Sequence, residues 1–311
     1  MAQRRAEGIT VSSPAGLSAA VGAVTVWGLG NVLAKYIDLS GPALAFDRLW
    51  FGAFYSFVLV AVFRRSLSLS GLRRAAPGGV AFGVNIALFF TAVKLTSVTD
   101  ATIIAALQPA ILLLVVGRLF GEKVTLVTVL GGVVAFGGTA LVVLAPGGGG
   151  RHTVWGDVLA AGAVVAWAWY FVASKRARRT MGTVEYQAAM TLVAAVVLTP
   201  VALVHGGRLA GGWGTWGWVV LLATVPGGGH FLMNWAHEHI SLAVASLLNL
   251  ATPVVAMAGA ALLLGERVTA LQMVGTAVTL VALAAVILDQ RGGPLPAEPV
   301  SAGMAPAPLE D

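Results

Sequence analysis

The 311-residue chain is too hydrophobic to fold as a soluble globule, because 58% of its residues are hydrophobic and only 10% are charged. Soluble proteins carry about 25% charged residues, so this chain lacks the side chains to cover a water-facing surface. Its net charge of +6 does not indicate nucleic-acid binding, since Lys and Arg stand in short clusters between apolar runs. The absence of cysteine excludes disulfides, thiol catalysis and thiolate metal sites.

Ten apolar segments follow one another, and each meets or approaches the ~20 residues that a helix needs to cross the bilayer core. Helices are expected because lipid cannot satisfy open backbone groups. The first segment follows Arg4 and Arg5, as in a signal peptide. No small-residue cleavage site ends it and many spans follow, so we interpret it as a transmembrane helix. The predicted helices are 16–34, 42–62, 78–95, 98–119, 125–144, 156–174, 183–204, 216–236, 242–263 and 270–288.

The positions of the charged residues predict the orientation of these spans. With the N-terminus inside, most Lys and Arg residues fall in cytoplasmic segments, as the positive-inside rule requires. Both termini are therefore expected in the cytoplasm. An aromatic belt is then predicted at the outer interface, formed by Trp155, Trp213, Trp216 and Trp218.

The segment Ala101–Thr125 recurs in the second half of the chain as Ala245–Thr269. A repeat at a fixed offset indicates one structural unit present twice. Each unit holds an odd number of predicted helices, so the second unit enters the membrane in the opposite orientation. The two copies share a central proline and a closing Gly-Glu-Lys/Arg turn, with the matched pairs Pro109/Pro253, Gly121/Gly265 and Glu122/Glu266.

The predicted fold class is therefore an all-α integral membrane protein, with ten transmembrane helices arranged as two inverted-topology five-helix repeats. A Gly-rich run between the halves is typical of a flexible linker. The Pro- and Ala-rich C-terminus is typical of a disordered segment. The predicted division is a cytoplasmic N-terminus (1–15), the first repeat (16–145), a linker (146–155), the second repeat (156–290) and a cytoplasmic tail (291–311).

The repeat resembles a known family. Residues 93–104 and 238–248 resemble the third-to-fourth helix junction of two-domain EamA transporters, in the drug/metabolite transporter superfamily. Gln108-Pro109 and Thr252-Pro253, with the turns that follow, resemble the end of its fourth helix. The resemblance covers about 16–288 and implies a ten-helix secondary transporter, usually an exporter, with a cavity lined by helices 1, 3, 4, 6, 8 and 9. It does not indicate the substrate, because the family carries amino acids, their derivatives, drugs, sugars and other metabolites.

Polar side chains deep in the spans are candidates for substrate binding. The alternative is hydrogen bonding between helices, worth only ~0.6–2 kcal/mol each. Pro109 and Pro253 each remove a helix hydrogen bond and are predicted hinges, with a static packing kink as the alternative. Gln108 and Thr252 rank first because they stand beside these prolines. The polar candidates are Asn31, Asn85, Gln108, Asn234, Asn249 and Thr252.

Aromatic residues within the spans, Trp27, Trp167 and Tyr170, are candidates for a cavity wall. Trp167 and Tyr170 are three positions apart and can share one helix face, whereas Trp169 points to another side. Such a wall would suit an amphipathic or cationic organic solute, through stacking or cation–π contact. Contact with lipid or plain packing is the alternative.

Three ionisable residues in or near the spans, His230, Asp47 and Glu185, are candidate proton carriers, because such groups are costly in a membrane and often functional. His230 is the deepest, and its ordinary pKa of about 6.5 lies near working pH. A buried neutral histidine bonded to a neighbour is the alternative. Asp47, with Arg48 beside it, and Glu185 stand near helix ends, where side chains can reach the interface.

The chain has no GxxxxGK[ST] loop for ATP, no HExxH and no GxSxG elbow, and the glycines of 131–138 indicate close helix packing. We predict a secondary transporter, not an enzyme, that exports a small polar or amphipathic metabolite, such as an amino acid, a derivative or a drug-like solute, by alternating access. Its predicted place is the bacterial plasma (inner) membrane, as a monomer or homodimer, without cofactor, metal or nucleic acid. The alternatives are a membrane channel or scaffold, or an intramembrane enzyme without a recognisable motif.

Overall fold

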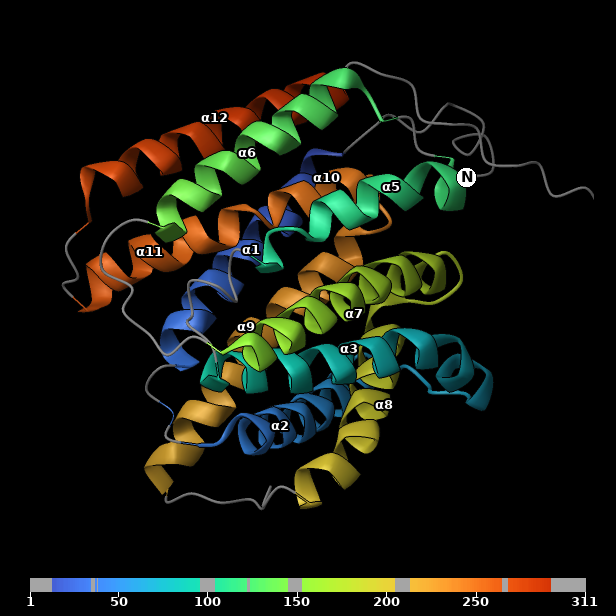
Figure 1. The fold of residues 1–311 in the computed structure, drawn as a ribbon. Helices are drawn as coiled ribbons and strands as arrows, with labels where there is room; N and C mark the ends of the chain where they lie inside the picture. Colours follow the sequence, from blue (N-terminus) through green and yellow to red (C-terminus); the bar gives the residue numbers. More distant parts are fainter. Residues whose placement is uncertain are drawn as a thin grey trace, which may run out of the picture.

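The computed structural model describes residues 13–34, 37, 39–95, 104–121, 124–144, 153–204, 213–264 and 268–291, and these ranges form helices and turns without a strand. Figure 1 shows the helices packed side by side as a bundle. They are α1 (Pro14–Ala34), α2 (Gly41–Val62), α3 (Leu69–Leu95), α5 (Gln108–Phe120), α6 (Leu126–Leu144), α7 (Val154–Arg178), α8 (Thr183–Val204), α9 (Trp213–Ala236), α10 (Leu242–Leu248), α11 (Ala251–Leu264) and α12 (Ala270–Arg291).

The described helices include seven segments long and apolar enough to cross a membrane, taken from α2, α3, α7, α8, α9, the α10–α11 pair and α12. Three shorter apolar segments lie in α1, α5 and α6. Each of these segments overlaps one of the ten predicted from the sequence, and seven of them reach the length of a span. The third begins earlier than predicted, at Leu69, because the Ser68 hydroxyl accepts a hydrogen bond from the Gly71 N–H at 3.0 Å and caps the helix there.

Two of the predicted spans are broken near their middle. In the first half, a turn at Ala106-Leu107 precedes α5, and in the second half a turn at Asn249-Leu250 separates α10 from α11. Pro109 is the second residue of α5, where its missing N–H removes no helix hydrogen bond. Pro253 is the third residue of α11 and also lies in the first turn of its helix. The prolines therefore follow helix breaks, rather than bending continuous helices as the sequence suggested.

The two halves pack in opposite directions. α6 and α12 hold the same place in the two repeats and lie side by side (Figure 1). The Thr125 hydroxyl, just before α6, donates to Asp289 Oδ2 near the end of α12 at 2.6 Å, so these two helices are antiparallel. The other contacts also correspond when the halves are exchanged, since α1 packs on α9 as α3 packs on α7.

Glycines bring the backbones of α6 and α12 into direct contact. A Cβ atom on Gly138 would lie 2.7 Å from the carbonyl oxygen of Gly275, and one on Gly275 would lie 2.6 Å from that of Gly138. A backbone atom cannot move aside as the end of a flexible side chain can. For Gly138 this is the close helix packing that the glycine-rich run predicts.

Gly138→Ala is therefore expected to lower the free energy of unfolding by about 1–3 kcal/mol through overpacking. Gly137→Ala is the matched control, because a Cβ atom there has no neighbour within 4 Å. The control should be neutral or stabilising by up to about 1 kcal/mol, since alanine favours helix over glycine. Thermal unfolding of the two purified variants in one detergent compares them. Equal melting temperatures would contradict the close contact.

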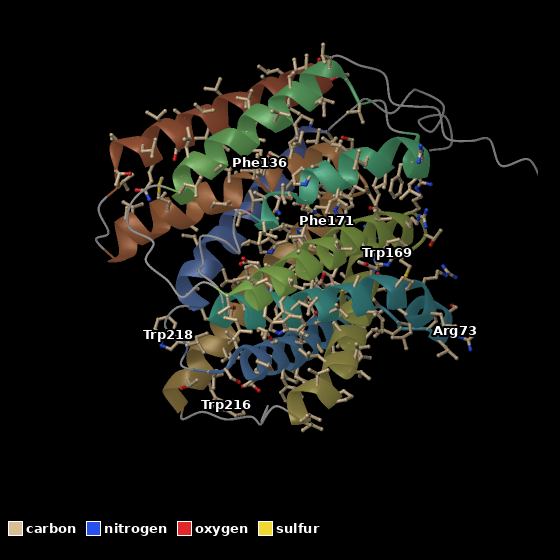
Figure 2. The ribbon with its side chains drawn as sticks, viewed as in Figure 1. Arg73, Phe136, Trp169, Phe171, Trp216 and Trp218 are labelled. Atoms are coloured by element: carbon tan, nitrogen blue, oxygen red, sulfur yellow. The ribbon has the colours of Figure 1, made fainter. Side chains whose placement is uncertain are left out.

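The outward faces of the bundle are apolar, as in a protein surrounded by lipid. Phe54, Leu114 and Val281 are 70%, 79% and 71% exposed. Figure 2 shows Trp216 and Trp218 at one end of the bundle and Arg73 at the other. We refer to these as the tryptophan end and the arginine end, and α7 runs from the first to the second (Figures 1 and 2).

Candidate functional site

A cavity of about 170 Å³ lies between the two halves of the chain. On α7 its lining ends at Trp167, and the next inward-facing residues, Tyr170 and Phe171, are fully buried. Asn234 and Ala236, near the end of α9, are fully buried as well. The cavity therefore lies toward the tryptophan end, and packed side chains fill the space toward the arginine end. Its aromatic, polar and charged lining residues are Trp27, Arg48, Asn85, Phe89, Phe90, Trp167, His230, Asn249 and Thr252.

The two halves each contribute a tryptophan to one wall of the cavity. The Trp27 and Trp167 rings meet edge to face, with centroids 5.3 Å apart. The Trp27 indole N–H donates to the carbonyl oxygen of Pro226 at 3.1 Å, which holds the ring in place. Trp167 and Tyr170 share one helix face with centroids 5.0 Å apart, while Trp169 is 52% exposed on another side. The wall is therefore rigid and largely apolar.

The two helix breaks meet beside the cavity. The Asn249 side-chain amide donates to Gln108 Oε1 at 3.3 Å, and the Thr252 hydroxyl donates to Asn249 Oδ1 at 3.1 Å. Gln108 is fully buried, and its Nε2 has no hydrogen-bond partner among the described residues. Asn249 therefore connects the break of the first half to that of the second, and its side chain also lines the cavity.

Arg48 on α2 lines the same cavity, although the sequence analysis noted it without ranking it. Its Nη2 lies 3.2 Å from His230 Nε2, and its guanidinium stands over the Phe90 ring, 5.8 Å from the centroid. A guanidinium can only donate, so His230 Nε2 is the acceptor. The signal was available in the sequence, because a charge inside a span is itself a functional hypothesis. Its place a few residues into the helix, however, is also typical of a side chain that reaches the membrane interface.

Hydrogen bonds continue from the Arg48–His230 pair toward the arginine end. His230 Nδ1 lies 3.5 Å from the Tyr170 hydroxyl, which donates to Asn234 Oδ1 at 3.1 Å. The Asn234 amide then donates to Gln187 Oε1 at 2.7 Å. A consistent donor pattern places the imidazole proton on Nδ1 and makes His230 neutral. Gln187 also lines a second space of about 20 Å³ on the other side of the Arg48–His230 pair.

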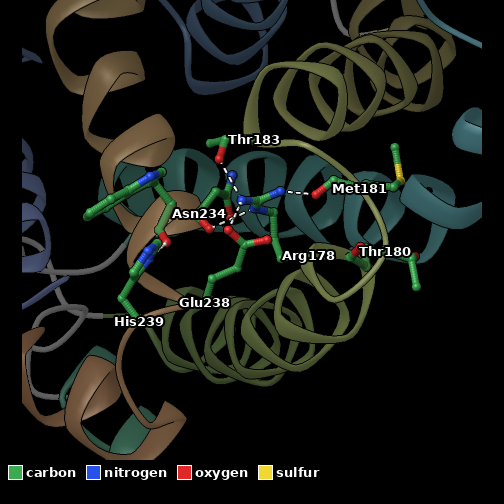
Figure 3. Close-up of polar contacts among 9 residues, drawn as sticks. Arg178, Thr180, Met181, Thr183, Asn234, Glu238 and His239 are labelled. Carbon is green, nitrogen blue, oxygen red and sulfur yellow. Dashed lines mark hydrogen bonds and ion pairs between the residues drawn. The ribbon is translucent and has the colours of Figure 1, made fainter. Parts of the chain in front are cut away.

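Arg178, at the end of α7, joins three segments at the arginine end (Figure 3). Its side chain is 2% exposed, and its Nε donates to the carbonyl oxygen of Asn234 at 3.0 Å. Its Nη2 lies 2.6 Å from the Thr183 hydroxyl and 2.7 Å from Glu238 Oε2, and Nη1 donates to the Met181 carbonyl. In the sequence, Arg178 is one of the basic residues that predict a cytoplasmic segment, and nothing there indicates its burial.

The structure brings most of the predicted site residues together and leaves a few apart. Gln108, Tyr170 and Asn234 are fully buried behind the cavity lining. Asp47 is 4% exposed and does not line the cavity, and Glu185 lies at the arginine end, 3.7 Å from Arg65. Pro109 is buried in α5, and the side chain of Asn31 falls outside the described part of the chain. The predicted residues that line the cavity are Trp27, Asn85, Trp167, His230, Asn249, Thr252 and Pro253.

His237 follows the end of α9 and is buried beside positive charges. Its side chain is 2% exposed and contacts the Phe171 ring edge to face at 5.0 Å. Burial first, and then the charges of Lys175 and Arg178, hold the pKa of His237 well below its ordinary value. The unfolded chain therefore binds a proton below about pH 6.5 that the folded chain does not, so stability is lost as the pH falls.

The melting temperature in detergent is accordingly expected to be constant above about pH 7 and to fall below about pH 6.5. This single group contributes at most ~1.4 kcal/mol per pH unit. His237→Leu should reduce the slope between pH 6.5 and 5, whereas His239→Leu, two residues on, should keep it. The same slope in wild type and His237→Leu would contradict this account.

The comparisons with known proteins agree with this arrangement. The profile of the EamA-like transporter family matches residues 14–144 and 154–288, one match in each half. A solved structure titled "Crystal structure of protein" shares the fold, with a TM-score of 0.78 and 21% identity over 90% of this chain and 99% of that chain. A search of curated protein sequences finds no match. The chain therefore belongs to the EamA-like transporter family, as a two-domain membrane transporter of the drug/metabolite transporter superfamily.

Proposed function

We propose that the protein is a secondary transporter that moves a small polar or amphipathic metabolite by alternating access. The observation that carries the proposal is the cavity between two antiparallel halves, with a broken helix from each half meeting beside it. Inverted repeats with broken helices around a central site are the usual architecture of such carriers. The ten apolar segments are its ten spans, in two repeats of opposite orientation.

The direction of opening follows from the two ends of the bundle. The positive-inside rule assigns the arginine end to the cytoplasm of a bacterial cell. The cavity then lies on the outer side of a closed cytoplasmic seal that Arg178 holds together. Exchange of the conformations of the two halves would open the site inward, so that a cytoplasmic solute could enter and be exported. A channel open to both sides is disfavoured, because the residues of α7 that face inward between Trp167 and Arg178 are buried, which favours a site closed toward the arginine end.

The natural absence of cysteine makes accessibility labelling the most direct test of this geometry. Single cysteines at positions 122 and 266 should react with an impermeant maleimide from opposite sides of the membrane. Ala106→Cys lies in the cavity lining and should react with the maleimide from outside. Ala177→Cys, at a position that is 6% exposed near the arginine end, should not react with the maleimide from outside. Labelling of positions 122 and 266 from the same side would overturn the inverted arrangement.

The coupling ion of the proposed carrier is best tested at His230, the one predicted proton carrier that lines the cavity. A proton-coupled carrier would accumulate its solute in response to an imposed pH gradient, and His230→Gln would abolish that response. Glu185→Gln, at the arginine end and outside the cavity lining, should keep the response if His230 is the carrier of the proton. If the wild type accumulates its solute equally with and without the pH gradient, transport is not coupled to protons. None of the three candidates, His230, Asp47 and Glu185, would then be a proton carrier.

A further inference from the structure

Arg48 places a positive charge in the cavity wall, and no described residue gives it a negative partner. Its only hydrogen-bond partner in the described chain is the neutral His230, and no described carboxylate lies within ion-pair distance of it. Among the described residues, no aspartate or glutamate lines the cavity. An unpaired charge within a membrane span is costly, and such residues generally pair with one another or mark a substrate pathway. We therefore infer that the solute supplies the negative charge that pairs with Arg48.

The geometry around Arg48 suits one anionic group. His230 occupies Nη2 and orients the planar guanidinium, and among the described residues none accepts from Nε or Nη1. A guanidinium edge with free N–H groups binds a carboxylate through two parallel hydrogen bonds. One guanidinium beside a neutral imidazole balances a single negative charge, which favours a monoanion over a dianion such as a phosphate monoester.

The rest of the cavity suits an apolar body. The Trp27 and Trp167 rings form one wall. Phe89 and Phe90 of α3 also line the cavity, and the Phe90 ring lies beside the Arg48 guanidinium. A free amino acid would also bring an ammonium group, for which the described lining residues offer no carboxylate. Because a buried unpaired charge is costly, the cavity should discriminate against zwitterions and cations. The aromatic residues thus serve stacking rather than the recognition of a cation.

We propose that the cavity selects amphipathic organic monocarboxylates, with the carboxylate on Arg48 and the apolar part on the tryptophan wall. The proposal rests on the proposed transport function and specifies its solute class. An anion also gains from leaving an inside-negative cell, by about 50-fold in equilibrium concentration ratio per 100 mV. The membrane potential alone therefore favours export of such a solute.

Phenylalanine and its capped derivatives provide a matched set of probes that differ mainly in charge. N-acetylphenylalanine is a monoanion, N-acetylphenylalaninamide is neutral, phenylalanine is a zwitterion and phenylalaninamide is a cation. Binding to the purified protein is measured by quenching of tryptophan fluorescence, since Trp27 and Trp167 line the cavity. The monoanion is expected to bind about 10- to 100-fold tighter than its neutral amide, the range of one charge-assisted hydrogen-bonded pair.

Arg48→Gln should remove this preference, and Arg48→Lys should retain part of it, because lysine keeps the charge and loses the planar fork. Arg65→Gln removes a cation at the arginine end and should keep the preference. The elution volume in size-exclusion chromatography identifies folded variants. If Arg48→Gln does not fold, the binding preference of Arg48→Lys is compared with that of the wild type instead. Equal or weaker binding of the monoanion, or no binding of any probe, would overturn the proposal.

Counterflow of the same four probes in proteoliposomes separates this proposal from the function on which it rests. Exchange of the neutral or cationic probes at the rate of the monoanion would overturn the anion site and leave the carrier in place. Selective binding of N-acetylphenylalanine without counterflow of any probe would support the anion site and contradict transport.

Discussion

Replacing Arg178 with methionine is expected to lower the free energy of unfolding by about 2–5 kcal/mol, because two carbonyl oxygens of buried residues lose a charged hydrogen-bond donor. From the end of α7, the guanidinium bonds to Asn234 near the end of α9, to the turn before α8, to the first residue of α8 and to Glu238 (Figure 3). Methionine fills a similar volume but donates no hydrogen bond, so the Asn234 and Met181 carbonyls lose these donors. Monodisperse protein should be recovered in much lower yield, with a lower melting temperature.

Arg176→Met is the matched control for this prediction, because Arg176 lies on the same helix two residues earlier and is exposed. It removes the same charge near the same membrane surface and should leave the melting temperature almost unchanged. Arg178→Lys should fall between the two, since lysine keeps the charge but cannot reach four acceptors at once. A melting temperature of Arg178→Met equal to that of Arg176→Met would contradict the role of Arg178 as the anchor of the arginine end.

Asn249→Leu is expected to reduce exchange of the transported solute about tenfold or more, because it separates the two helix breaks. The change removes the 3.3 Å hydrogen bond to Gln108 Oε1 and leaves that fully buried amide without a partner. The free energy of unfolding should fall by about 1–3 kcal/mol, the cost of an unsatisfied buried polar group. Counterflow in proteoliposomes and thermal unfolding in detergent measure the two effects on one preparation.

The double variant Gln108→Leu/Asn249→Leu distinguishes a mechanical role from a structural one. Replacing both partners by apolar groups removes the unsatisfied amide, so the melting temperature should recover toward the wild-type value. Exchange should stay low, because the halves still lack the hydrogen bond that couples them. Full exchange in Asn249→Leu, or recovery of exchange together with stability in the double variant, would contradict the coupling.

Most of the fold could be predicted from the sequence. A span must be a long apolar helix, and the repeat is recognised from matched residues at a fixed offset. Hydropathy alone locates the seven long apolar segments and the three shorter ones, although not all of their ends. The breaks before α5 and between α10 and α11 could not be placed, since proline at the first turn of a helix and proline within a kinked helix look alike in one sequence. The antiparallel contact of Gly138 with Gly275 required the three-dimensional packing.

The candidate site could be predicted in part. Trp27, Asn85, Trp167 and Asn249 were found because polar and aromatic residues stand out against apolar spans. The sequence places Arg48 near the start of a span. It does not show that this face of α2 is turned toward the cavity. The roles of Tyr170 and Asn234 behind the lining likewise depend on hydrogen bonds between helices distant in sequence.

The central claim, that the protein is a carrier with a single site exposed alternately to the two sides, is tested most directly by counterflow in proteoliposomes of the purified protein. The external solution carries a panel of labelled amino acids, N-acylated derivatives, other organic acids and organic cations. The account predicts that uptake of one chemical class is accelerated by the same unlabelled solute inside. Uptake at one rate with and without internal solute, or no protein-dependent uptake across the panel, would contradict it.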